Sequence, residues 1–228
     1  MIKLQKVFLK IRQLKKVNLQ LKDILAREKS DLVRDAAVQR FEYTVEIAWK
    51  TLQKYLAWQE LVCPTPRECI KAAYKAEIID NLEAWIDLLK LRNQTSHAYG
   101  EEIAEDVYSN IGNLQIEVEK LIQNLNQKLL KEKLLEIISK FSNLDDIALF
   151  VFGSQADQTA NAKSDLDLGL LGREKLDPKI LNAIKTEIED LPFMIDLVDF
   201  NSVEDDFKNF ALKHIIIWHQ GKNISLIF

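Results

Sequence analysis

The chain has 228 residues, of which 47% are apolar, and its net charge is −4. It contains only 6 glycines and 4 prolines, which favours long helices over a β-rich fold. No apolar run approaches the roughly 18 residues that span a membrane, and the basic N-terminus lacks the apolar block of a signal peptide. We therefore expect a cytoplasmic protein with no membrane partner. Cys63 and Cys69 match neither a zinc knuckle nor a disulfide framework and are expected to be reduced thiols.

The charge is divided unevenly along the chain. Residues 1–133 contain 22 basic and 19 acidic residues, a net +3, whereas residues 134–228 contain 9 and 16, a net −7. The mildly basic first part is compatible with a nucleic-acid partner, and the acidic second part suits a site that collects cations. Ordinary solvated surface explains both counts equally well.

The first part of the chain predicts long amphipathic helices. Apolar residues at loosely helical spacing indicate a helix over residues 1–28, and residues 31–60 give the strongest helical pattern of the sequence. One wide apolar face of that second helix comprises Phe41, Val45, Ala48, Trp49, Leu52 and Leu56.

Capping residues predict where the following helices begin. Thr65 can cap a short helix, with Pro66 at its first position and Glu68 completing a capping box. Asn81 can cap the next helix, and another long helix is expected over residues 101–130. The first part therefore reads as an all-helical domain, residues 1–130.

Residues 131–228 change to an α/β pattern with a small mixed sheet and flanking helices. Strands are expected at residues 147–153, 164–171 and 193–200, with a short final strand at 223–228. Helices are expected at residues 134–141, 177–191 and 205–221. Asp177 with Pro178 marks the start of the second of these helices, and Gly221 the end of the third.

The stretch FGSQADQTANAKSDLDLGLL carries the clearest chemistry of the second part. Asp165 and Asp167 are two residues apart, so on a strand both carboxylates leave the same face. Two carboxylates held in this way require a cation between them, and Mg²⁺ with nucleotide phosphates is the usual one. Gly153 can turn backbone N–H groups toward a phosphate, and Ser154 adds a hydroxyl donor.

A third carboxylate would complete a two-metal site. Asp196, in the predicted strand MIDLVDF, is the candidate because Ile195 and Leu197 can anchor that strand. Asp199 lies three residues later, so on a regular strand it points to the opposite face.

This segment resembles the minimal nucleotidyltransferases (MNT, the MntA-like antitoxin type) of the polymerase-β-type superfamily. Their signature of G-S, about ten residues, D-x-D and a later Asp matches Gly153, Ser154, Asp165, Asp167 and Asp196. The resemblance covers roughly residues 134–228 and implies Mg²⁺- or Mn²⁺-dependent transfer of a nucleotide, such as AMP from ATP. This chain has Gln155 where many relatives carry Arg or Tyr. An inactive relative or a chance acidic strand is the alternative interpretation.

A second cluster of reactive side chains lies in LRNQTSHAYG, residues 91–100. On an ideal helix Arg92 and Tyr99 share a face, as do Asn93 and His97, but Arg92 and His97 are about 140° apart. Arg92 and His97 could therefore meet at one phosphate only if the helix loosens before Gly100 or a partner chain supplies one of them.

Three stretches, QRFEYTVEIAWKTL, PTPRECIKAAYKAEIID and WIDLLKLRNQTSHAY, resemble the HEPN family, in particular its nucleotidyltransferase substrate-binding, HepT-like toxin branch. The resemblance covers roughly residues 5–130 and implies an antiparallel helical bundle. The motif of Arg, four residues, His, any residue and Tyr matches Arg92, His97 and Tyr99, with Asn93 at a supporting polar position. It implies a metal-independent ribonuclease that cuts RNA as a homodimer, and an MNT partner that silences it by adding AMP to Tyr99.

In that case His97 would be the general base for a ribose 2′-hydroxyl and Arg92 would stabilise charge on the phosphate. The favoured hypothesis is a fused toxin–antitoxin protein, because a plain binding module needs neither His97 nor Tyr99. The alternatives are a non-catalytic HEPN domain that presents another acceptor to the nucleotidyltransferase, or a structural dimer in which both sites have decayed. His214 and His219 are expected to be structural.

Overall fold

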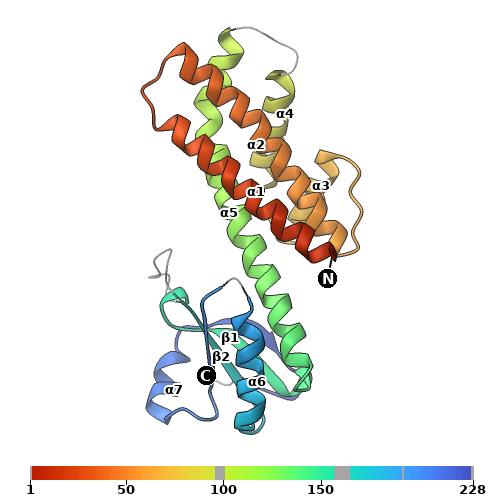
Figure 1. The fold of residues 1–228 in the computed structure, drawn as a ribbon, viewed down its shortest axis with the longest axis vertical. Coiled ribbons are helices and arrows are strands. Elements are labelled where there is room, and N and C mark those ends of the chain that lie inside the picture. Colours follow the sequence, from red (N-terminus) through yellow and green to blue (C-terminus); the bar gives the residue numbers. More distant parts are fainter. Residues whose placement is uncertain (1, 96–100, 157–164, 192, 227–228) are drawn as a thin grey trace. The chain divides into compact units, whose positions relative to one another are not determined.

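A computed structural model describes residues 2–95, 101–156, 165–191 and 193–226 (Figure 1). The chain divides into two compact units, Met1–Lys128 and Leu129–Phe228. Each unit has a different architecture and is described by itself. Within the described residues, no helix is long and apolar enough to cross a membrane.

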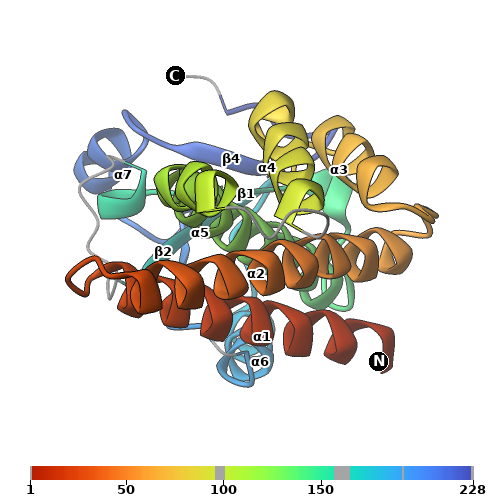
Figure 2. The same cartoon turned by 90° about the horizontal axis from the view of Figure 1, so that it is seen from above.

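The first unit is built from helices, as the sequence predicts. Its elements are α1 (Ile2–Leu25), α2 (Asp31–Trp58), α3 (Pro66–Lys75), α4 (Leu82–Thr95) and the first part of α5 (Glu101–Ser139). Figure 2 shows α1 and α2 side by side along most of their lengths. The buried apolar residues of α1 are spaced three or four apart, as an amphipathic helix requires, and comprise Val7, Ile11, Leu14, Val17, Leu21 and Ile24.

The predicted apolar face of α2 and the predicted N-terminal caps of α3 and α4 are present. On α2, Phe41, Ala48 and Leu52 are fully buried. Thr65 and Glu68 form the reciprocal capping box at the start of α3. The Asn81 side chain accepts a hydrogen bond of 3.0 Å from the backbone N–H of Ala84 at the start of α4.

Helix α5 corrects the prediction of two helices over residues 101–130 and 134–141, because it is continuous over Glu101–Ser139. The connecting residues NQKLLKEK contain no Gly or Pro that would end a helix. The apolar spacing also continues past the expected break, since Leu125, Leu129 and Leu134 are all buried.

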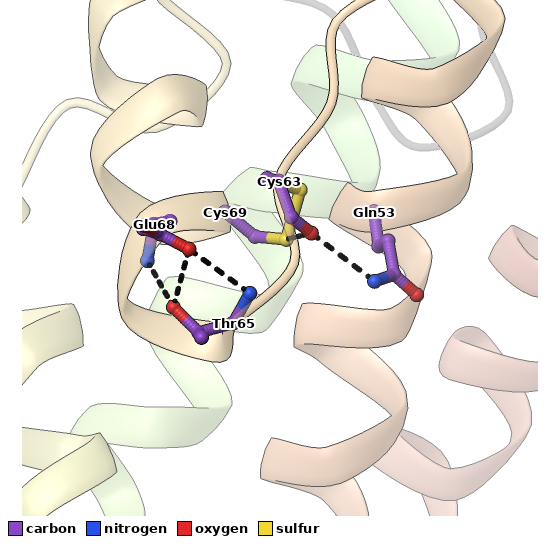
Figure 3. Close-up of a disulfide and its surroundings, with 5 residues drawn as sticks. All are labelled: Gln53, Cys63, Thr65, Glu68 and Cys69. Atoms are coloured by element: carbon purple, nitrogen blue, oxygen red, sulfur yellow. Dashed lines mark hydrogen bonds between the residues drawn. A yellow bond between two sulfur atoms is a disulfide. The ribbon is translucent and has the colours of Figure 1, made fainter.

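A disulfide joins Cys63 to Cys69, so the expectation of two reduced thiols is wrong (Figure 3). Cys63 lies in the connection before α3 and Cys69 lies within α3. Both side chains are buried, and the carbonyl of Cys63 accepts a hydrogen bond from the Gln53 side chain of α2. The α2–α3 connection brings the two residues together, which the spacing alone does not indicate. The cytoplasmic location stays a prediction.

The second unit contains a mixed four-stranded sheet in the order β3-β2-β1-β4, with flanking helices (Figure 1). The strands are β1 (Ile147–Val151), β2 (Leu166–Gly172), β3 (Ile195–Asp199) and β4 (Ile216–Gln220), and the helices are α6 (Pro178–Glu189) and α7 (Asp205–Ala211). Short 3-10 turns, η1 (Leu144–Asp146) and η2 (Gly153–Gln155), flank β1. Strand β1 is antiparallel to β2 and β4, whereas β2 and β3 are parallel. The Asp177 side chain caps α6 and Pro178 begins it, as predicted.

Apolar side chains cover both faces of this sheet. One cluster joins the sheet to α6 and to the last turns of α5, and includes Leu149, Leu168, Ile184 and Ile138. The cluster on the opposite face contains Phe150, Phe152, Phe200 and Ala211 of α7. Gly169 makes room for it, since a Cβ there would lie 2.2 Å from the Phe150 ring.

The predicted helix over residues 205–221 is also corrected. Only Asp205–Ala211 is helical, and Ile216–Gln220 forms the edge strand β4 beside β1. The run HIIIW is rich in β-branched and aromatic residues, which fit a sheet better than a helix interior. His219 therefore lies on a strand, where its ring contacts the Leu144 carbonyl oxygen at 2.8 Å. Residues 223–226, the described part of the expected final strand, are not a strand.

Candidate functional site

Three aspartates gather where β2 and β3 begin. Asp165 is exposed and directly precedes β2, Asp167 is half-buried within β2, and Asp196 is exposed on β3. In the parallel register Asp167 is the direct partner of Asp196. Because paired residues on neighbouring strands direct their side chains to the same face, the register places these carboxylates side by side.

The electrostatics of Asp167 reflect this crowding. Burial raises the pKa of the Asp167 carboxyl, and the negative charges of Asp196 and Asp165 raise it further. All three causes act against the ionised form of Asp167. A cation between the carboxylates would reverse the balance by favouring their charged forms.

The backbone that follows β1 lies close to the Asp167 carboxylate. Gly153 has φ +69°, a conformation that favours glycine, and a Cβ at Gly153 would lie 2.6 Å from Oδ2 of Asp167. The N–H of Phe152 donates a 3.1 Å hydrogen bond to the Asp167 carbonyl, which fixes this approach. Ser154 follows in η2 and is half-buried. Gly153 is therefore required for both its conformation and its closeness to Asp167.

The donor set suits a hard divalent cation, because carboxylate oxygens are the ligands that Mg²⁺ and Mn²⁺ prefer. Asp165, Asp167 and Asp196 would hold such an ion, and the tight approach of Gly153 leaves no side chain between it and Asp167. In the described ranges, no three His, Cys, Asp or Glu side chains are already placed to ligate one ion. Ligation of one ion by all three carboxylates would thus require them to move closer together.

Asp199 lies apart from this cluster. It pairs with Leu170, whose side chain belongs to the cluster packed on α5 and α6, on the opposite face from Asp167. Asp199 is buried and accepts hydrogen bonds from the Asn201 backbone N–H at 3.0 Å and the Ser202 hydroxyl at 2.7 Å. These contacts give it a structural role at the end of β3.

An open cavity of about 430 Å³ lies beside Asp196, along the edge strand β3. It is lined by Asp165, Lys185, Ile188, Glu189, Phe193, Met194, Ile195, Asp196 and Leu197. Of the described residues in this lining, only Lys185, from α6, is basic. Lys185 was not predicted from the sequence, because the position of a lysine on a helix does not reveal which strand the helix packs beside.

The ribonuclease motif is described only in part. Arg92 is in the last turn of α4, and its Nη2 lies 4.0 Å from Oε2 of Glu46 on α2. Lys50 also hydrogen-bonds Glu46; this bond lowers the pKa of Glu46, and the charge of Arg92 adds to the effect. Asn93 is exposed on α4, whereas His97 and Tyr99 lie outside the described residues. The contact between Glu46 and Arg92 could not be predicted from the sequence, because it depends on how α2 packs against α4.

Two family models divide the chain between them. Residues 3–127 match the family described as nucleotidyltransferase substrate binding protein like, and residues 132–223 match polymerase beta, nucleotidyltransferase. The first match covers the helical unit, and the second covers the sheet with its aspartates.

Two proteins of Haemophilus influenzae (strain ATCC 51907 / DSM 11121 / KW20 / Rd) are each similar to part of this chain. A probable ribonuclease HepT is 26% identical over 103 residues, which cover 43% of this chain and 70% of that protein. A probable protein adenylyltransferase MntA is 30% identical over 83 residues, which cover 35% of this chain and 73% of that protein.

Among solved structures, a protein from Thermus thermophilus is 30% identical, with a TM-score of 0.47 over 49% of this chain and 98% of that one. The family assignment depends on the sequence matches. The chain belongs to the nucleotidyltransferase substrate-binding-protein-like family, of the HepT-like HEPN type, here fused to a nucleotidyltransferase domain of the polymerase-beta type.

Proposed function

We propose that the second unit transfers AMP from ATP to Tyr99 of the HEPN motif, and that this transfer silences a metal-independent endoribonuclease in the first unit. The observation that carries the proposal is the register of Asp167 and Asp196 on adjacent parallel strands, with Gly153 folded against Asp167. The relatives HepT and MntA, a probable ribonuclease and a probable protein adenylyltransferase, support the pairing of the two activities.

The transfer is an in-line displacement at the α-phosphorus of ATP. The Tyr99 hydroxyl oxygen forms a bond to the α-phosphorus, the bond to the bridging oxygen breaks, pyrophosphate leaves, and the phenolic proton passes to solvent. Asp165, Asp167 and Asp196 would hold a divalent cation, which would supply positive charge near the phosphates. Gly153 and Ser154 lie on the β1 side of Asp167, where their N–H and hydroxyl groups can bind the departing phosphates.

The ribonuclease half of the proposal uses Arg92 and His97. His97 removes a proton from the ribose 2′-hydroxyl, and Arg92 stabilises the charge that develops on the phosphate. AMP on Tyr99, two residues from His97, adds bulk and negative charge where RNA phosphate has to bind. A homodimer through the HEPN domain would let two chains share one cleft.

Intact-mass spectrometry of the full chain after incubation with ATP and Mg²⁺ tests the transfer. We expect mass to be added in AMP-sized steps, and peptide mapping to place it on Tyr99. Tyr99→Phe should lose the label, whereas Tyr74→Phe, at an exposed tyrosine of α3, should keep it.

The two candidate aspartates of β3 provide a matched pair for the same assay. Asp196→Asn should reduce labelling by at least about a hundredfold, a loss expected when transition-state charge is no longer stabilised. Asp199→Asn should retain labelling, because Asp199 faces away from Asp167. Labelling that survives Asp196→Asn but not Asp199→Asn would contradict the assignment of the third carboxylate.

One observation favours a second candidate function. Arg92 is already paired with Glu46, so the guanidinium has a structural role without RNA. A non-catalytic HEPN domain that presents another acceptor to the nucleotidyltransferase accommodates this pairing. In that case the label would appear on a separate molecule, and Tyr99→Phe would leave the rate of transfer unchanged.

A further inference from the structure

The positive charge of the first unit is concentrated on α1. Residues 1–25 contain 7 basic residues and 1 acidic residue, a net +6, whereas residues 26–133 contain 15 and 18, a net −3. The apolar stripe of α1 is buried within the helical unit, so the basic residues are left on the outward face of the helix. The exposed basic residues of this face are Lys6, Arg12, Lys15, Lys16 and Lys22.

Most of these cations are not neutralised by the protein itself. Lys22 lies 3.8 Å from a carboxylate oxygen of Glu119 on α5, whereas the other four have no acidic partner among the residues that the structure describes. From Lys6 to Lys22 the row extends about 24 Å along the helix axis. A row of unpaired cations on one helix face is the electrostatic footprint expected for a polyanion.

An exposed aromatic ring lies directly beside this row. Gln13 of α1 donates a 3.1 Å hydrogen bond to the hydroxyl of Tyr43 on α2, and Lys10 donates a 2.9 Å hydrogen bond to Oε1 of Gln13. The Tyr43 side chain is 47% exposed. Exposed rings next to basic side chains are the surfaces on which unpaired bases stack. The combination of cations and a ring therefore fits a single-stranded nucleic acid.

The same surface continues to the arginine of the ribonuclease motif. Helix α2 lies between α1 and α4 (Figure 2). On α2, Glu46 follows Tyr43 by three residues, bonds Lys50 and lies 4.0 Å from Nη2 of Arg92 on α4. The acidic side chains of this surface, Glu46 and Glu42 one turn before it, are thus on the side of α4, and α1 supplies the attraction for phosphates.

An anionic membrane would also attract a basic helix, but it requires an apolar face that can insert among the lipids. The apolar stripe of α1 is already buried in the helical unit. Its exposed large apolar residues are Leu9 and Leu19, which are ten positions apart and form no continuous face. These features favour a nucleic acid over a membrane.

We propose that the outward face of α1, together with Tyr43, binds the backbone of a single-stranded RNA whose scissile phosphate lies at Arg92. The choice of RNA rests on the proposed ribonuclease function, and the inference adds the surface that holds the strand beyond the cleavage motif. Lys6 and Lys16 contact phosphates, and Tyr43 stacks on a base. Contacts of this kind position a strand without selecting its sequence.

Fluorescence anisotropy of the full chain with a labelled oligouridine of about 12 nucleotides tests this surface, since single-strand sites are about this size. All proteins carry His97→Ala and are kept in EDTA, so that the RNA stays intact. In about 0.1 M salt, Lys6→Gln with Lys16→Gln should weaken binding at least about tenfold and reduce the slope of log affinity against log salt by about 1.4. Lys71→Gln with Lys75→Gln removes the same charge from exposed positions of α3 and should change the affinity less than about twofold.

The tyrosine contribution has its own matched pair. Tyr43→Leu should weaken binding at least about fivefold and leave the salt slope unchanged, because stacking involves no counterion release. Tyr74→Leu, at a tyrosine of α3 with a similar exposure of 45%, should bind as tightly as the background protein.

Equal weakening by the two lysine pairs, or none by the α1 pair, would overturn the assignment. Retained RNA binding by the α1 pair, with loss of its binding to phosphatidylserine vesicles, would assign the face to a membrane and overturn it as well. Failure of the proposed function is distinguishable, because Asp165→Ala that cleaves no RNA would contradict the ribonuclease alone. Selective loss of binding by the α1 pair would still support the surface. Equal unfolding temperatures of all variants exclude misfolding.

Discussion

Asp167 is held in a position that disfavours its charged form. Its burial and its two aspartate neighbours all raise the pKa of its carboxyl. Gly153 lies so close to Asp167 that any larger residue at position 153 would clash with the carboxylate. Such a cost is typical of a site that gains its stability from a ligand. The shared face of Asp165 and Asp167 stays a prediction from their spacing, whereas Gly153 has the positive φ that the sequence analysis expected glycine to allow.

Replacing Asp167 should therefore stabilise the metal-free protein. A carboxyl with a raised pKa in the folded state contributes stability at low pH, and this contribution is lost as the pH rises through the folded-state pKa. In EDTA at neutral pH we expect Asp167→Asn to raise the unfolding temperature by about 2–4 °C, the shift typical of 1 kcal/mol in a chain of this size. The gain should vanish near pH 3, where Asp167 is protonated in both states.

Mg²⁺ should have different consequences for the wild type and for Asp167→Asn. Mg²⁺ should raise the unfolding temperature of the wild type but not that of Asp167→Asn, since a ligand stabilises only the state that binds it. Thermal unfolding by differential scanning calorimetry measures both effects. A lower unfolding temperature for Asp167→Asn in EDTA would show that the carboxylate is structurally stabilising.

At the scale of elements, local signals predicted more than long-range ones. Thr65, Asn81 and Asp177 each mark a helix start because capping depends on residues within one turn. The strand Ile216–Gln220 was misassigned to a helix because its identity depends on pairing with β1. Lys185 and Glu46 were missed for the same reason, since their neighbours come from distant parts of the chain.

The α2–α3 connection adds a covalent link that the sequence pattern did not suggest. Closing a loop between residues six positions apart should stabilise the unit by about 2 kcal/mol, chiefly by restricting the unfolded chain. Alkylation under denaturing conditions should label neither Cys63 nor Cys69 without reductant, and both after reduction. Reduction should also lower the unfolding temperature of the wild type but not of the Cys63→Ser, Cys69→Ser double variant. Two alkylated cysteines in the unreduced chain would contradict the disulfide.

At the scale of the whole molecule, one chain combines two units whose relatives are separate proteins. The two family matches lie on either side of residue 130, and HepT and MntA each match less than half of the chain. Fusion supplies the nucleotidyltransferase and its proposed acceptor in equal amounts. The proposed ribonuclease activity of the first unit would then depend on whether the second unit has already transferred AMP to Tyr99.

RNA cleavage by the full chain before and after incubation with ATP and Mg²⁺ tests this account most directly. Asp165→Ala, which cannot add AMP, should cleave a single-stranded RNA in EDTA, and prior ATP should not change its rate. The wild type, once labelled on Tyr99, should lose at least about 90% of that cleavage, because RNA phosphate and the added AMP compete for one place. His97→Ala should cleave in neither state. Equal cleavage by labelled wild type and Asp165→Ala, or none by Asp165→Ala, would contradict the account.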